Sequence, residues 1–196
     1  HQTSLKVTAV DYRLSPEHKH PAAFEDVLDI FESLDRNIPV ILVGDSAGGT
    51  LVSMLANHLK GTTRKLKGQV LIYPYLGGNM KAGSYLIHEK APCLTTANMK
   101  FYLKCWMDTK INSIKLPLDE SDFSNLPTTI VFTASDDPLN SDGIDYVKKI
   151  NLSKGKAFHF EGEGLVHGYL RARHSVKKAK ISFAKIIKSL ILLSQN

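Results

Sequence analysis

The stretch spanning residues 40–49 constrains the fold of this chain more than any other. A run of branched apolar residues, 40–43, ends abruptly at the pattern Gly-x-Ser-x-Gly, and apolar residues then recur at helical spacing. This order predicts a strand, a tight turn and a helix, with Ser46 at the apex of the turn and the helix N-terminus directed at it. We expect glycine at Gly44 and Gly48 because a side chain at either position would collide where strand and helix pack closely.

Short apolar strands alternate with helical patterns over most of the chain. We predict strands at 5–10, 39–43, 68–74, 129–134 and 157–160, and helices at 21–34, 50–60, 96–107, 143–152 and, for most of its length, 171–193. Strands of this continuously apolar kind favour an α/β fold, in which helices cover both faces of a mostly parallel sheet. The length of 196 residues fits one such domain, 1–196.

The alternation breaks between residues 77 and 118. Glycines mark loops at the beginning of this segment, and the helix predicted at 96–107 is rich in aromatic residues. We interpret 77–118 as an insertion that forms a lid or a wall of a substrate pocket. Ordinary core packing of the aromatic side chains is the alternative.

Composition narrows the partners that we expect. The formal net charge is +6, but much of the surplus lies in one segment, 177–188, where basic and apolar positions alternate as on a solvated helix. No aromatic and basic interleaving accompanies the charge, so we expect no nucleic-acid partner. The longest apolar run, 186–193, is too short for a membrane span. Cys93 and Cys105 lack metal-ligand or redox spacing, which favours a reducing compartment such as the cytoplasm.

Three predicted loops at the carboxyl ends of strands carry a serine, an acid and a histidine. In chain order they are Ser46, then Asp136 or Asp137, then His167. This is the order of the α/β-hydrolase triad, in which histidine removes the proton of the serine hydroxyl and a carboxylate orients the histidine. Each residue also has a simpler interpretation: a small residue tolerated in a turn, a helix-capping aspartate, or a surface histidine. Their occurrence together and in this order favours the triad.

The remaining histidines do not combine into a site. His18 and His20 form an H-x-H pair, but no acidic or cysteine cluster accompanies them. We therefore expect loop histidines, no metal and no cofactor.

Four stretches together resemble the hormone-sensitive-lipase-like family of α/β-hydrolases, a group of carboxylesterases and lipases. They are VDYRLSPEH at 10–18 with PAA at 21–23, GDSAGG at 44–49, DPL at 137–139 with DG at 142–143, and HGY at 167–169. The resemblance runs from the first predicted strand to the last predicted helix. It implies an α/β-hydrolase fold.

The resemblance also implies roles for particular residues. Ser46 matches the family's nucleophile and His167 its base, and the acid stands directly before Pro-Leu, which selects Asp137 over Asp136. The backbone N–H of Ala47 matches one donor of the oxyanion hole. The family's His-Gly-Gly-Gly-type loop, which supplies the other donors, is not found in this chain. We therefore expect a partial domain of a longer protein, without the family's first strands and its oxyanion loop.

The function expected from these residues is that of a serine carboxylesterase acting on short-to-medium acyl esters through an acyl-enzyme. Amide or formamide hydrolysis by the same triad is a second reading, because both reactions pass through a tetrahedral intermediate. A non-catalytic small-molecule-binding protein on the same fold is a third. The partner expected is a small-molecule ester, with a second copy of the chain in a homodimer as a further option.

Overall fold

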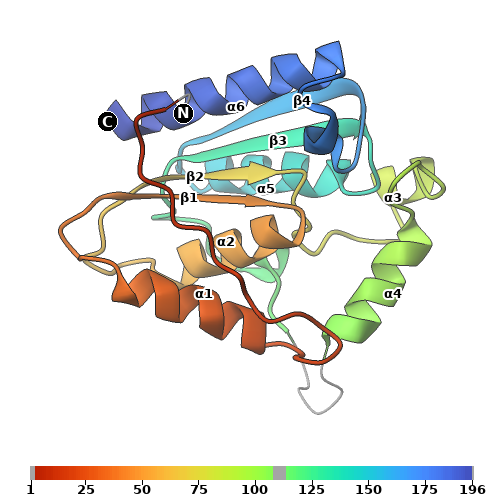
Figure 1. Ribbon diagram of the computed structural model, residues 1–196. Helices are drawn as coiled ribbons and strands as arrows, with labels where there is room; N and C mark the ends of the chain where they lie inside the picture. Colours follow the sequence, from red (N-terminus) through yellow and green to blue (C-terminus); the bar gives the residue numbers. More distant parts are fainter. Residues whose placement is uncertain (1–2, 108–113, 196) are drawn as a thin grey trace.

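Four parallel strands form the centre of the molecule (Figure 1), a computed structural model that describes residues 3–107 and 114–195. The strands are β1 (Val40–Asp45), β2 (Leu66–Ile72), β3 (Thr129–Asp136) and β4 (Ala157–Val166). They lie side by side in chain order, and each pairs in parallel with the next. Parallel neighbours need a crossover between them, which is why helical segments separate these strands along the chain.

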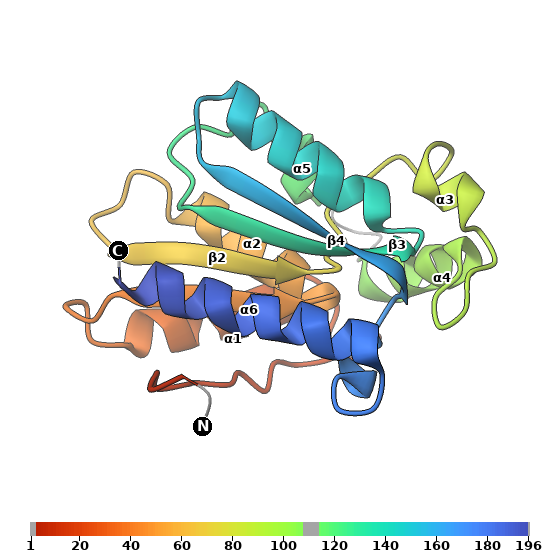
Figure 2. The ribbon, with the colours of Figure 1, turned by 90° about the horizontal axis from the view of Figure 1, so that it is seen from above.

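Helices cover both faces of the sheet. On one face lie α2 (Ala47–His58) and α5 (Asn140–Leu152), and α1 (Ala22–Ser33) packs against α2. The other face is covered by α6 (Lys177–Gln195), which lies over the sheet and runs roughly along β2 in Figure 2. The predicted α/β class, with helices on both faces of a parallel sheet, is confirmed.

Successive residues of a strand supply the two hydrophobic clusters of the core. In β2, Leu71 packs with the α2 and α5 side chains, whereas Val70 and Ile72 pack with those of α6. All three are at most 4% exposed. Because both faces of β2 are covered, its sequence has no polar alternation. Each such side chain stabilises the fold by about 1.5–3 kcal/mol through burial.

The segment between β2 and β3 lies beside the carboxyl ends of the strands (Figure 1). It contains α3 (Ser84–Ile87), α4 (Thr96–Trp106) and the 3-10 turn η1 (Pro117–Asp119). Helix α4 begins where the Thr95 hydroxyl accepts a hydrogen bond from the Asn98 N–H, a reciprocal capping arrangement. A third cluster, which includes Tyr85 and Met99, anchors this segment to Leu139 at the start of α5. Part of the predicted insertion, 108–113, lies outside the described residues.

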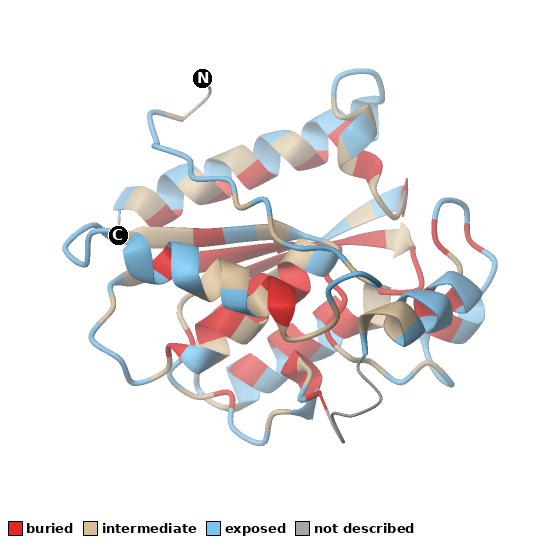
Figure 3. Cartoon of the chain, turned by 60° about the horizontal axis from the view of Figure 1, so that its bottom comes forward, coloured by how far each residue is buried: buried red, intermediate tan, exposed pale blue. Residues whose placement is uncertain are grey.

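The strand predicted at 5–10 is wrong. This segment pairs with no strand of the described sheet, and residues 4–9 are exposed, with Val7 at 81%. In Figure 3 it is almost entirely pale blue, whereas buried residues gather on the strands. An apolar stretch becomes a strand only when a partner accepts its hydrogen bonds, and none of the four strands does so here.

Several predicted boundaries also differ from the structure. Helix α2 begins at Ala47, three residues before the predicted start, because the turn at Ser46 leads directly into it. Strand β4 continues to Val166, past the predicted end at residue 160, after a shift of register opposite Ala134–Asp136. The C-terminal helix is preceded by the separate 3-10 turn η2 (Tyr169–Ala172).

Candidate active site

Ser46 lies in a strained turn at the carboxyl end of β1. Its φ of 52° is in the left-handed region, which non-glycine residues seldom adopt. The turn is held from both sides: the Ser46 N–H donates to the Ile72 carbonyl at 2.9 Å, and the Ser46 carbonyl accepts from the Thr50 N–H at 3.2 Å. The side chain therefore projects beyond the sheet, as the sequence predicted.

The glycines around this turn differ in what they permit. A Cβ at Gly44 would run into the carbonyl of Gly48, and a Cβ at Gly49 would lie 2.7 Å from Cβ of Pro74. A Cβ at Gly48 would meet nothing within 4 Å in the described structure. The steric expectation therefore holds for Gly44 and is wrong for Gly48. The backbone carbonyl of Gly48 lies close to Gly44 of β1, whereas the place that a Gly48 side chain would occupy is open.

The structure brings Ser46, His167 and Asp137 into one hydrogen-bonded chain. Ser46 Oγ lies 2.8 Å from His167 Nε2, and His167 Nδ1 lies 2.7 Å from Asp137 Oδ2. A carboxylate only accepts hydrogen bonds, so Nδ1 is the protonated nitrogen and Nε2 is free to accept from the serine hydroxyl. The His167 side chain is 12% exposed and that of Asp137 is 1% exposed. The three residues meet because each directly follows a strand of one parallel sheet: β1, β4 and β3.

The two neighbouring aspartates have different surroundings. Asp137 is fully buried, and its second oxygen, Oδ1, accepts the Leu139 N–H at 2.9 Å. Asp136 instead accepts from the Ser135 hydroxyl at 2.9 Å. Of the two aspartates, Asp137 is the one that contacts His167.

A second buried carboxylate, Asp142, supports the loops of the site. Its Oδ2 accepts the N–H groups of Leu76 at 2.8 Å and Gly78 at 3.2 Å, and the Tyr85 hydroxyl at 3.1 Å. Burial raises the pKa of Asp142 to about 6, although these three hydrogen bonds act in the opposite direction. The sequence contained Asp142 within a family-like stretch but gave it no role. Its position five residues after Asp137, in the first turn of α5, was the available signal.

A pocket of about 340 Å³ opens beside Ser46. Its walls come from the segment 12–15, the start of α2, Tyr75 and helix α4, and they include the apolar side chains of Met99, Leu103 and Trp106. The segment 12–15 is fixed to α1 because Arg13 donates from its backbone N–H and its Nε to the Asp26 carboxylate, at 2.8 and 2.9 Å. Pocket walls from four parts of the chain therefore meet at the serine.

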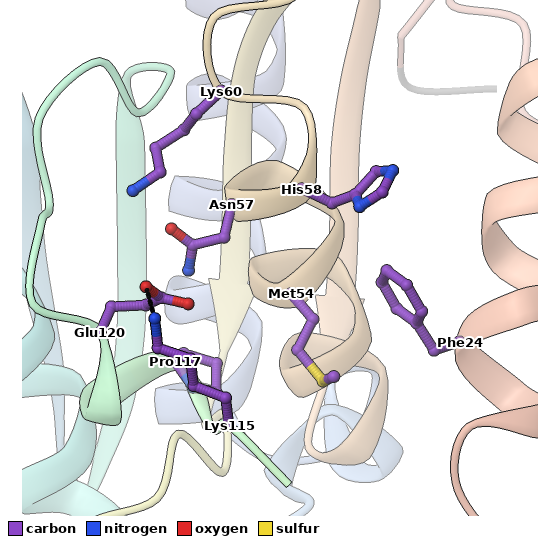
Figure 4. A pocket seen from close by; sticks show the side chains of 8 residues that line it. All are labelled: Phe24, Met54, Asn57, His58, Lys60, Lys115, Pro117 and Glu120. Atoms are coloured by element: carbon purple, nitrogen blue, oxygen red, sulfur yellow. Dashed lines mark ion pairs between the residues drawn. The ribbon is translucent and has the colours of Figure 1, made fainter.

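A second cavity, of about 250 Å³, lies at the C-terminal end of α2, away from Ser46 (Figure 4). Its rim carries Phe24 and His58, whose rings meet edge to face, and its charged side chains include Lys115 and Glu120, which form an ion pair of 2.6 Å. It holds no hydroxyl paired with a base, and we assign it no chemistry.

The other candidate residues stay apart from the triad. His20 packs on Trp106 with ring centroids 5.2 Å apart, and burial lowers its pKa. Within residues 3–107 and 114–195, no group of three or more metal-ligating side chains is arranged to hold a metal ion. Cys93 and Cys105 are free thiols. No helix in the described part of the chain has the length and apolar character to cross a membrane.

The chain matches one family model and several known proteins. A family model described as alpha/beta hydrolase fold matches residues 1–171. An arylesterase of Saccharolobus solfataricus is 28% identical over 198 residues, which cover 94% of this chain and 64% of that protein. Carboxylesterase NlhH of Mycobacterium tuberculosis is 28% identical over 180 residues, covering 84% of this chain and 56% of the relative.

Among solved structures, an esterase of Pyrobaculum calidifontis superposes with a TM-score of 0.84 at 27% identity, over 94% of this chain and 65% of that one. The chain therefore spans less than two thirds of the length of these relatives.

Proposed function

The chain belongs to the α/β-hydrolase fold family, and from this premise we propose that the protein is a serine carboxylesterase acting on short-to-medium acyl esters. The observation that carries the proposal is the unbroken hydrogen-bonded chain from Ser46 through His167 to Asp137. The relatives at 28% identity named as arylesterase and carboxylesterase support an ester as the substrate.

In the proposed reaction, Ser46 Oγ attacks the ester carbonyl while His167 Nε2 takes its proton. The tetrahedral intermediate collapses when His167 returns this proton to the leaving alcohol, and the acyl group remains on Ser46. A water molecule then attacks the acyl-enzyme, with His167 again acting as base, and releases the acid. Asp137 keeps the proton on Nδ1 and stabilises the imidazolium that forms in each step.

The oxyanion that develops on the carbonyl needs preorganised donors. In the proposal, the backbone N–H of Ala47 is one of them, since it belongs to the first turn of α2, where backbone N–H groups have no partner within the helix. The positive end of the α2 dipole favours negative charge at the same place. Loss of a single oxyanion donor typically costs about 10²–10³ in kcat.

The pocket next to Ser46 is the proposed site of the acyl or alcohol group. Its volume of about 340 Å³ and its aromatic and aliphatic walls suit a small apolar group. Helix α4, which contributes Met99, Leu103 and Trp106 to the wall, is the part of the segment 77–118 to which we assign the pocket-forming role. Aromatic residues from this segment therefore serve the site as well as the core.

The proposal is tested by the hydrolysis of p-nitrophenyl acetate and butanoate by the full-length protein. Ser46→Ala is expected to lower kcat by about 10⁶, the size seen when a triad nucleophile is removed. Ser33→Ala, an exposed serine at the end of α1, is the matched control and is expected to keep wild-type activity. Equal activity of Ser46→Ala and the wild type would exclude this mechanism.

Two further measurements separate the neighbouring functions. Turnover of an ester compared with that of the matching amide decides between carboxylesterase and amidase, because both bonds are accessible to the same triad. A fluorophosphonate probe should label Ser46 in the folded protein. Failure to label would instead indicate a small-molecule-binding protein that keeps the fold without the chemistry.

A further inference from the structure

Each strand of the sheet is followed directly by a residue at the active site, and at β2 this residue is Tyr73. Ser46 follows β1, Asp137 follows β3 and His167 follows β4. Because β2 lies between β1 and β3, Tyr73 stands between the nucleophile and the acid at the carboxyl edge of the sheet. The proposed reaction assigns it no part.

The backbone of Tyr73 is held in a conformation that a bulky side chain seldom adopts. Its φ is 36°, and its N–H donates to the Phe132 carbonyl at 2.6 Å. Tyr73 is 2% exposed. A positive φ at a non-glycine residue is costly and persists where the surroundings enforce it, often at functional sites. Here the turn directs the ring toward the histidine.

The ring of Tyr73 packs on the imidazole of His167. The two ring centroids are 4.8 Å apart, with the planes tilted by 59°. The ring also meets Tyr169 edge to face, with centroids 5.1 Å apart. A cation within about 6 Å of an aromatic centroid is attracted to the ring, and the attraction is larger at desolvated sites. His167 becomes such a cation each time it accepts the serine proton.

The hydroxyl of Tyr73 connects this ring to the nucleophile turn. It donates to Asp45 Oδ2 at 3.2 Å, and Asp45 is the residue directly before Ser46. Burial, and then the charge of Asp45, raise the pKa of Tyr73 above its ordinary value, so the hydroxyl stays protonated and remains a donor. A hydroxyl that donates to a carboxylate enriches its ring in electron density.

We propose that Tyr73 is a positioning residue for the base: its ring holds the His167 imidazole toward Ser46 and stabilises the imidazolium, and Asp45 strengthens this effect through the tyrosine hydroxyl. The inference rests on the proposed esterase function. It assigns a role to Asp45, the acidic residue of the Gly-Asp-Ser turn: Asp45 influences His167 through Tyr73.

The test must distinguish the effect of Tyr73 on His167 from the effects of the other polar groups nearby. Asp137 contacts Nδ1 and Ser46 contacts Nε2. Tyr169 and Arg171, from η2, lie close enough to Tyr73 to affect it, and Tyr12 faces Asp45. None of these groups is altered by a change confined to Tyr73 or Asp45.

The first experiment compares Tyr73→Phe and Tyr73→Leu in the full-length protein, with p-nitrophenyl butanoate from pH 5 to 9. Tyr73→Phe keeps the ring and is expected to retain kcat within about 3-fold. Tyr73→Leu is expected to lower kcat by about 10-fold with little change in KM, and to move the acidic limb of the kcat/KM profile down by about 0.5–1 pH unit. The limb moves down because the imidazolium has lost a stabilising partner.

Tyr146→Leu is the matched control, since it removes a buried tyrosine ring that packs on Phe123 in the other core cluster. It is expected to lower the stability of the protein without moving the acidic limb. A merely structural role for Tyr73 predicts the same behaviour for Tyr73→Leu. An unmoved limb in that variant would therefore overturn the proposal.

A double-mutant cycle tests the part assigned to Asp45 and requires no loss of the ring. Asp45→Asn is expected to move the acidic limb at least twice as far in the wild type as in the Tyr73→Phe background. Equal shifts in both backgrounds would mean that Asp45 acts directly through space, which contradicts the proposed route through Tyr73.

A titration of His167 by NMR keeps this inference separate from the esterase proposal. Its midpoint should fall in Tyr73→Leu and stay in place in Tyr146→Leu, with or without turnover. If the midpoint falls but the protein hydrolyses no ester, the proposed esterase function is rejected and the contact between Tyr73 and the imidazolium is supported. If the variants hydrolyse esters but the midpoint of His167 does not move in Tyr73→Leu, only the role proposed for Tyr73 is rejected.

Discussion

At the scale of single residues, the site depends on which of two adjacent carboxylates reaches the histidine. Asp137 is buried and contacts His167 Nδ1, whereas Asp136 turns to the Ser135 hydroxyl. The two side chains have the same chemistry and differ by one position in the chain. Asp136 therefore serves as a matched control for substitutions of Asp137.

We expect Asp137→Asn to lower kcat for p-nitrophenyl acetate by about 10⁴, because an amide at this position favours the wrong histidine tautomer. Asp136→Asn should keep kcat within about 2-fold, since its side chain touches no atom of the proposed triad. Steady-state kinetics of both variants in the full-length protein provide the comparison. A large loss in Asp136→Asn and a small one in Asp137→Asn would reverse the assignment.

From the sequence, Ser46 and His167 could be proposed as site residues, whereas the residues that support them could not. A serine in a glycine turn and a histidine after a predicted strand are rare enough to be recognised together. From the residues alone Asp136 and Asp137 were equal candidates, because both follow the same strand. Tyr73 was not recognisable, since a tyrosine at a strand end looks like ordinary packing until its φ and its neighbours are known.

At the scale of elements, Asp142 connects the segment after β2 to the helix that follows the acid. One carboxylate oxygen accepts hydrogen bonds from the 76–78 loop and from Tyr85 of α3, while its backbone belongs to α5. The Ser84 and Ser141 hydroxyls, 2.8 Å apart, tie the same two helices together nearby. The pocket-forming segment is thus fastened close to Asp137.

Asp142 predicts a particular dependence of stability on pH. Its pKa in the folded chain is raised from 3.8 to about 6, so the folded state holds this proton more firmly than the unfolded state. The stabilisation is present below about pH 4 and is lost as the pH rises through 6, a change on the order of 3 kcal/mol. Asp142→Asn keeps a hydrogen-bond acceptor but carries no charge. Between pH 4 and 7, its free energy of unfolding should therefore rise relative to that of the wild type by this amount.

Urea unfolding of both proteins at several pH values measures the difference. Subtracting one curve from the other removes the contribution of the remaining acids, which titrate in both proteins. A difference in unfolding free energy that stays flat from pH 4 to 7 would show that the three hydrogen bonds fully offset the burial of the charge.

The elements that the sequence predicted best are those buried on two faces. Continuous apolar runs identified β2 and β3 because a strand covered on both sides needs no polar residue. The apolar run of β1 also predicted a strand, although Val43 is 46% exposed there. The segment 5–10 has a similar composition but pairs with no described strand, so its prediction was wrong. The second half of β4, 161–166, was missed because its glycines and glutamates do not resemble a strand and register shifts there.

At the scale of the whole molecule, the pocket is assembled from parts that are far apart in the chain. The segment 12–15, the start of α2 and helix α4 meet around Ser46. The sequence predicted these parts separately but did not show that they meet at one pocket. The apolar spacing of a helix does not reveal which of its side chains faces a cavity. On α4, residues 99, 102, 103, 105 and 106 line the pocket, whereas residues 100, 101 and 104 do not.

This arrangement predicts a change of acyl preference on α4. Leu103→Ala enlarges the pocket and should raise the ratio of kcat/KM for p-nitrophenyl octanoate over butanoate by about 10-fold, since the room for extra methylenes is worth about 1–3 kcal/mol. Phe101→Ala is the control: it lies on the same helix, is 61% exposed and does not line the pocket. An equal rise in both variants would instead indicate a general loosening of α4.

The order of the strands also determines when the chemistry arises during synthesis of the chain. Strands β1 to β4 lie side by side in the sequence in which a ribosome would release them, so the sheet can be extended from one edge as the chain emerges. Ser46 is therefore made and placed early, while His167 follows the last strand, 121 residues later. A nascent chain carries the serine without its base, and its hydroxyl is no more reactive than that of any other serine. In the proposed esterase, Ser46 can act on an ester only after β4 has docked beside β3 and has brought His167 to the serine.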